Sequence, residues 1–76
     1  MIQEFEQVAL TIDLPQYHLQ AGDMGTVVDI TADQQEYTLE FFTLDGETFA
    51  VVPVLVSQIR RVGSHEIAHA RAVVEE

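Results

Sequence analysis

Apolar and polar side chains alternate along much of the chain up to residue 62, and this alternation predicts β-strands. It is clearest at residues 36–42, where Tyr37, Leu39 and Phe41 would share one face and the intervening side chains the other. Such a run is typical of an antiparallel strand with one buried face. In residues 26–31 the same rule places Val28 and Ile30 together, opposite Val27 and Asp29. Five short strands are predicted in all: residues 8–12, 26–31, 36–42, 48–53 and 59–62.

Turn residues separate these runs. Gly22 and Gly25 are expected to bracket a tight turn before the second strand, because glycine tolerates a positive φ. Asp45-Gly46 between two β-rich runs is a strong hairpin signal. Pro53 cannot donate a ladder hydrogen bond, so the fourth strand is expected to end near it, with a 3₁₀ turn over residues 54–58.

The pattern predicts an all-β protein: a small SH3-like barrel of about five antiparallel strands, residues 1–62, followed by a C-terminal extension, residues 63–76. No helix is predicted within residues 1–62. The loop over residues 14–20 is expected to plug one open end with its apolar side chains. An OB-type barrel is the alternative, although it normally needs a longer chain and a helix between its third and fourth strands.

The extension has two interpretations. Ser64 could cap a helix, and the alanines that follow favour one. Residues 67–74 are also short enough to form an extra strand, on this barrel or on that of a neighbouring subunit.

Charge is distributed unevenly along the chain. The formal net charge is -10, yet residues 1–59 contain ten acids and no Lys or Arg. The only cations are Arg60, Arg61 and Arg71. Such a surface repels a phosphate backbone, so nucleic acid is not an expected partner. An acidic barrel is either simply well solvated or complementary to a basic protein.

Composition further limits the kind of protein this chain can be. With 76 residues there is room for one domain, and the absence of cysteine excludes disulfides and Cys-ligated zinc. No stretch approaches the ~20 apolar residues of a membrane span. Acids occupy the N-terminal segment where a signal peptide needs cations, so we expect a cytoplasmic protein that does not contact membranes.

Several blocks in order carry a family resemblance. They are Val8-Ala9-Leu10-Thr11-Ile12-Asp13-Leu14-Pro15, Ala21-Gly22-Asp23-Met24-Gly25-Thr26-Val27-Val28, Tyr37-Thr38-Leu39-Glu40-Phe41, Asp45-Gly46 and Ser57-Gln58-Ile59-Arg60. Together they resemble the DUF4926 family of small bacterial proteins, to which no function is assigned. The resemblance implies a small barrel and no catalytic residues, and it favours a strand over a helix for residues 66–71.

The Gly-Asp-x-Gly-x-Val-Val turn is also loosely similar to KOW and other SH3-like modules of ribosomal and transcription proteins. Those modules bind RNA or protein through basic or aromatic loops. Here Asp23 and Asp29 stand where an RNA-binding loop would carry Lys or Arg. The similarity therefore concerns backbone geometry and does not predict RNA binding.

One motif suggests metal chemistry. His65-Glu66-Ile67-Ala68-His69 matches H-E-x-x-H, in which a helix presents two zinc-binding imidazoles and a glutamate base. Glu75 falls where a third ligand could stand. In a strand the two histidines would lie ~13 Å apart, too far to share one ion. The sequence favours a chance match, and we predict no metal site.

No other constellation predicts catalysis or cofactor binding. His18 has no nucleophile near it in sequence, and Ser57 and Ser64 lie in no nucleophile motif. The aromatic residues Tyr17, Phe42, Phe49 and Phe5 could form an exposed platform, but core or plug positions are favoured.

We therefore expect a non-enzymatic, acidic protein-binding module with a basic protein partner, in an antitoxin-like or regulatory role. The alternative is a structural module that forms homo-oligomers through residues 64–74. A metalloenzyme built on the H-E-x-x-H segment is disfavoured.

Overall fold

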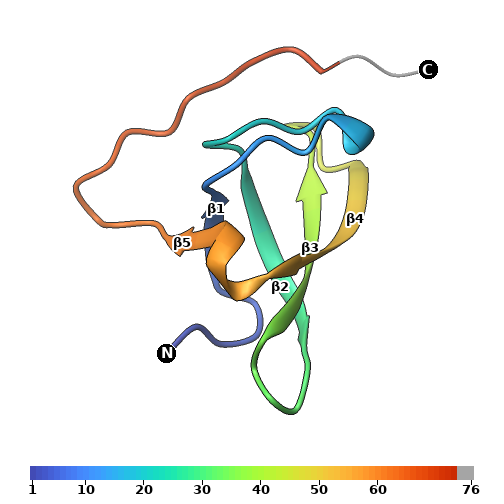
Figure 1. Ribbon diagram of the computed structural model, residues 1–76. Coiled ribbons are helices and arrows are strands. Elements are labelled where there is room, and N and C mark those ends of the chain that lie inside the picture. The colour runs from blue at the N-terminus through green and yellow to red at the C-terminus, as the bar shows by residue number, and fades with distance from the viewer. Residues whose placement is uncertain (74–76) are drawn as a thin grey trace.

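A single antiparallel sheet of five strands builds the domain, as predicted, and the computed structural model describes residues 1–73. The strands are β1 (Gln7–Leu10), β2 (Met24–Ile30), β3 (Glu36–Phe42), β4 (Thr48–Leu55) and β5 (Ile59–Arg61), in the spatial order β4-β3-β2-β1-β5 (Figure 1). The only helical segments in the described chain are two 3₁₀ turns, η1 (Pro15–Tyr17) and η2 (Val56–Gln58). This all-β architecture agrees with the small SH3-like barrel expected from the sequence.

The core is formed by inward-facing side chains of all five strands together with the β1–β2 loop. Tyr37, Leu39 and Phe41 of β3 are all buried, which confirms the alternation expected for residues 36–42. Leu14 and Leu19 come from the loop between β1 and β2 and join the same core, so this loop plugs one end of the barrel as expected. The other members are Val8, Leu10, Val27, Val52, Val54 and Ile59.

A bulge in β2 changes which of its side chains face inward. Val27 pairs with Leu39 and Ile30 pairs with Tyr37, while Val28 has no partner on β3. The extra residue shifts the alternation by one position, so Val27 and Ile30 both pack on the core. The predicted pairing of Val28 with Ile30 on one face was therefore wrong.

The two glycines near the start of β2 have different functions. Gly22 lies in the turn with φ +95°, as predicted. Gly25 was expected to close that turn, but it lies within β2 opposite Val8, beneath the ring of Phe41. A side chain at residue 25 would meet that ring, so packing rather than turn geometry requires glycine here.

β4 continues past Pro53 to Leu55, two residues beyond the expected end. The strand pairs only with β3 and forms the edge of the sheet, where a proline can turn its missing donor away from the ladder. The predicted 3₁₀ turn is correspondingly shorter and begins at Val56.

The described part of the extension, residues 63–73, contains neither helix nor strand. The strand favoured for residues 66–71 was therefore wrong, and so was the possible extra strand over residues 67–74 as far as residue 73; residue 74 lies outside the described residues. The extension begins with a turn, in which the Glu66 amide donates to the Gly63 carbonyl and the Glu66 carboxylate accepts from the Gly63 amide at 2.6 Å. From this turn the chain passes beyond the end of the barrel that carries the β1–β2 loop (Figure 1).

Candidate functional site: an acidic–apolar face and an arginine-filled notch

The outward side of the β3–β4 hairpin exposes apolar side chains beside acidic ones. On β4, Val51 and Leu55 are about half exposed, with Pro53 exposed between them. Each lies opposite a polar residue of β3, because the register pairs Glu36 with Leu55 and Glu40 with Val51. We call this surface the acidic–apolar face. Its members are Asp29, Glu36, Glu40, Phe42, Val51, Pro53 and Leu55.

Within residues 1–73, no arginine forms an ion pair with a carboxylate of this face. Each of the three arginines pairs elsewhere: Arg60 with Glu66 at 2.8 Å, and Arg61 with Glu6 at 2.9 Å. The third, Arg71, pairs with Asp23. The chain's positive charge is therefore held at β5, the N-terminal segment and the tail, and β3 and β4 keep a negative surface.

The free edge of β4 is poor in hydrogen-bond donors at its C-terminal half. Pro53 has no amide hydrogen, and the Leu55 amide donates to the Gln58 side chain at 2.7 Å. The Val56 amide donates to the Gln35 carbonyl at 3.0 Å. This part of the edge offers little to an added strand, so its apolar side chains, rather than its backbone, are available for contact.

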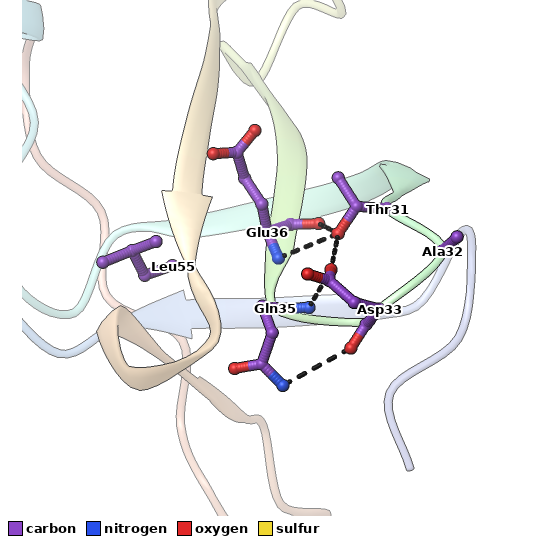
Figure 2. A pocket seen from close by; sticks show the side chains of 6 residues that line it. All are labelled: Thr31, Ala32, Asp33, Gln35, Glu36 and Leu55. Carbon is purple, nitrogen blue, oxygen red and sulfur yellow. Dashed lines mark hydrogen bonds between the residues drawn. The ribbon is translucent and has the colours of Figure 1, made fainter.

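A shallow hollow lies at one end of the acidic–apolar face. Figure 2 shows it between the β2–β3 loop and Leu55. Asp33 accepts hydrogen bonds from the Thr31 hydroxyl at 2.6 Å and the Gln35 amide at 3.1 Å. These bonds lower the pKa of Asp33, with the Thr31 hydroxyl contributing most. The carboxylate serves to hold the loop, and such a low-pKa group is poorly suited to act as a general base near neutral pH.

A second feature, formed by the β1–β2 loop, holds a side chain of the tail. The Arg71 guanidinium donates to both carboxylate oxygens of Asp23, from Nε at 2.8 Å and from Nη2 at 2.5 Å. Nη2 also donates to the His18 carbonyl at 3.0 Å. The two charged side chains are only 24% and 18% exposed. We call this site, formed by Asp23 and the His18 carbonyl, the Asp23 notch.

Local backbone geometry prepares the notch. His18 adopts a left-handed conformation, φ 60°, at the end of η1, and its carbonyl reaches Arg71. The Gln20 amide donates to Asp23 Oδ2 at 2.8 Å and fixes the carboxylate. Burial opposes ionisation of Asp23, but the hydrogen bonds from Arg71 and Gln20 outweigh it and lower the pKa.

The H-E-x-x-H segment does not form the helix that its chemistry requires. His65 lies in the turn that follows Gly63, and Glu66 is bound to Arg60 and to the Gly63 amide. Within residues 1–73 no three His, Asp or Glu side chains are grouped so as to hold a metal ion. The proposed third ligand, Glu75, lies outside the described residues.

The four aromatic residues that could have formed an exposed platform do not all lie on the surface. Tyr17 and Phe49 pack against the core, whereas Phe5 and Phe42 are largely exposed. The favoured core or plug positions are therefore confirmed for Tyr17 and Phe49 and were wrong for Phe5 and Phe42, of which Phe42 lies on the acidic–apolar face. Ser57 is exposed in η2 and Ser64 in the turn after Gly63, and His18 contributes its carbonyl to the notch.

The family model for a domain of unknown function, DUF4926, matches residues 4–61, which is most of the chain. The chain belongs to the DUF4926 family. The match covers all five strands of this DUF4926 domain and ends at the last residue of β5. The Asp23 side of the notch lies inside the match, and Arg71 lies outside it. No curated protein and no solved structure gave a significant match. No helix within the described residues is long and apolar enough to cross a membrane.

Proposed function

We propose that this DUF4926 domain is a non-enzymatic protein-binding module whose acidic–apolar face docks on a basic protein. The observation that supports the proposal is the row of exposed apolar residues on β4, Val51 and Leu55 among them, lying directly against Glu36 and Glu40 of β3. Exposed apolar patches rimmed by polar residues are typical of interaction sites. The uncompensated carboxylates would select a cationic rim on the partner and accelerate its association.

Docking on the face is favoured over addition of a strand to β4. A partner strand would need donors along the edge, and from Pro53 to Val56 these are missing or already used. Nucleic acid is not a favoured partner, because each arginine is already paired with a carboxylate of this chain. An antitoxin-like or regulatory role would follow if binding suppresses the partner's own activity.

The proposal is tested by photo-crosslinking. A full-length chain carrying a photoreactive amino acid at position 51 is incubated with lysate of the source organism, at low and at high salt. The matched control carries the same group at Ile67, an exposed apolar residue of the tail. We expect a basic partner that crosslinks from position 51, not from position 67, and less at high salt.

Affinity measurements with the purified partner complete the test. We expect Val51→Asp and Glu40→Gln each to weaken binding by about tenfold or more, as for central interface residues. Glutamine at position 40 can still accept the hydrogen bond of Thr48, so the fold is retained. Ile67→Asp and Glu4→Gln introduce the same chemical changes outside the face and should leave binding unchanged. Equal effects from both pairs of variants would contradict the proposal.

Self-association through residues 64–74 is the second candidate, and the contacts of the tail bear on it. Arg71 docks on the barrel of its own chain, a short distance along the sequence from β5. A tethered group competes at an effective concentration in the millimolar range, so exchange between subunits is expected only in very concentrated solution. Light scattering of the full chain and of a chain ending at Gly63 tests this, and finding both chains monomeric would exclude self-association.

A further inference from the structure

The tail touches the barrel in a way that resembles a bound peptide. Residues 63–70 are all exposed, and Arg71 is the first side chain after Val62 that is partly buried. The Arg60–Glu66 ion pair holds the start of the tail against β5. Within residues 67–73, the side chain that bonds to the barrel is that of Arg71, whose guanidinium enters the Asp23 notch.

The notch has the features of an arginine-recognition site. The carboxylate receives two parallel hydrogen bonds from Nε and Nη2, the fork geometry that a lysine cannot reproduce. A backbone carbonyl, that of His18, accepts a third bond from the same guanidinium. The Gln20 amide fixes the carboxylate from the barrel side, so the acceptors on the barrel are positioned by residues other than the tail.

We propose that the Asp23 notch is a recognition site for an arginine side chain of a basic partner protein, and that Arg71 of the chain's own tail occupies it at rest. The partner presents its arginine on an extended segment and displaces the tail. Charge complementarity identifies this occupant, because the first 59 residues carry ten acids and no Lys or Arg. The tail then sets a threshold for binding: at equal affinity, the concentration of the partner's arginine must exceed the effective concentration of Arg71.

This inference is independent of the acidic–apolar face, since the notch is formed by the β1–β2 loop and shares no residue with the face. Binding at position 51 can fail while the notch still takes an arginine, and the reverse also holds. The two tests therefore use different probes and different variants.

The test uses the full-length chain and a synthetic peptide with the sequence of residues 64–73 as the stand-in for a partner segment. Amide chemical shifts of His18, Gln20 and Asp23 report binding in ¹⁵N NMR titrations. A second peptide carries glutamine in place of arginine. The full-length variant Arg71→Gln empties the notch without truncating the chain.

We expect the arginine peptide to shift these amides in Arg71→Gln, and the glutamine peptide to leave them unchanged. Wild type should need at least about tenfold more arginine peptide for the same shift, because its tail competes. Adding Asp23→Asn to Arg71→Gln should abolish binding. Asparagine retains an oxygen for the Gln20 amide, so the turn is kept.

The matched control is Asp13→Asn in the Arg71→Gln background. Asp13 lies in the same loop and accepts a hydrogen bond from the Ala21 amide at 2.9 Å, but is not among the hydrogen-bond or ion-pair partners of Arg71. This variant should bind the peptide as Arg71→Gln does. Equal binding to wild type and Arg71→Gln, equal binding of the two peptides, or binding that survives Asp23→Asn would each overturn the proposal.

Discussion

Gly25 allows a quantitative test of how tightly the barrel is packed. A Cβ added to Gly25 would lie 3.0 Å from Cε2 and from Cζ of Phe41, and 3.2 Å from Cδ2. Favourable carbon–carbon contacts lie at about 3.5–4.0 Å, so the methyl group of Gly25→Ala overlaps the ring. Phe41 is only 4% exposed and cannot move out of the way without disturbing its neighbours.

The expected magnitude follows from two opposing effects. Overpacking of this kind costs about 1–3 kcal/mol. Replacing glycine by alanine within a strand returns roughly 0.5–1 kcal/mol, because the unfolded chain loses freedom. The difference is about 0–2.5 kcal/mol, and two contacts at 3.0 Å favour its upper part. We therefore expect Gly25→Ala to lower the free energy of unfolding by about 1–2 kcal/mol, and Tm by roughly 4–16 °C for a domain of this size.

Urea unfolding followed by far-UV circular dichroism measures the loss, and a double-mutant cycle assigns its cause. Phe41→Leu removes the ring edge that the methyl group meets, so Gly25→Ala should cost about 1 kcal/mol less in the Phe41→Leu background. Gly22→Ala is the control partner, because a Cβ at Gly22 meets nothing within 4 Å. That second pair should be additive to within about 0.5 kcal/mol.

Two outcomes would refute this reasoning. One is a Gly25→Ala chain with unchanged stability, which would mean that the ring yields freely. The other is the same coupling energy for both glycines, which would mean that the effect does not come from contact with Phe41.

Three further predictions concern the turn, the tail and the sheet edge. Gly22→Ala should cost about 1–2 kcal/mol through its positive φ alone, measured by the same urea unfolding. The Arg60 side chain, with the Gly63 amide, lowers the pKa of Glu66 to about 2. The contact therefore contributes its full stability above the ordinary carboxyl pKa of 4.5 and loses it as the pH falls toward 2. ¹³C NMR of the Glu66 carboxyl carbon should show this titration, and Arg60→Gln should raise the pKa of Glu66. Pro53→Thr restores an edge donor, so light scattering should show more association at high concentration with an unchanged dichroism spectrum.

The sequence predicts the fold well wherever a residue's structure is decided by its neighbours along the chain. The alternation around Leu39 gives β3 with its observed limits, and Asp45-Gly46 marks the hairpin that follows. The end of β4 was misplaced because a proline's effect depends on whether its strand lies at the sheet edge, which a sequence does not state. Gly25 was misassigned for a similar reason, since the ring above it is contributed by another strand.

The candidate sites were predictable only in part. The uneven charge shows that the barrel is acidic, but the apolar run around Val51 has no period that separates its outward from its inward residues. The Asp23 notch leaves no sequence signal, because it joins two residues 48 positions apart through one side-chain contact. Only the folded chain brings them together.

The bulge in β2 has a consequence for comparing members of this family. Val28 is the extra residue, so a relative that lacks one residue here would still direct the counterparts of Val27 and Ile30 inward. Loss of a residue earlier in β2 would instead exchange the inside and outside of the strand. Alignments should therefore place a single-residue gap at Val28, and relatives with that gap should have a flatter sheet, because a bulge adds local twist.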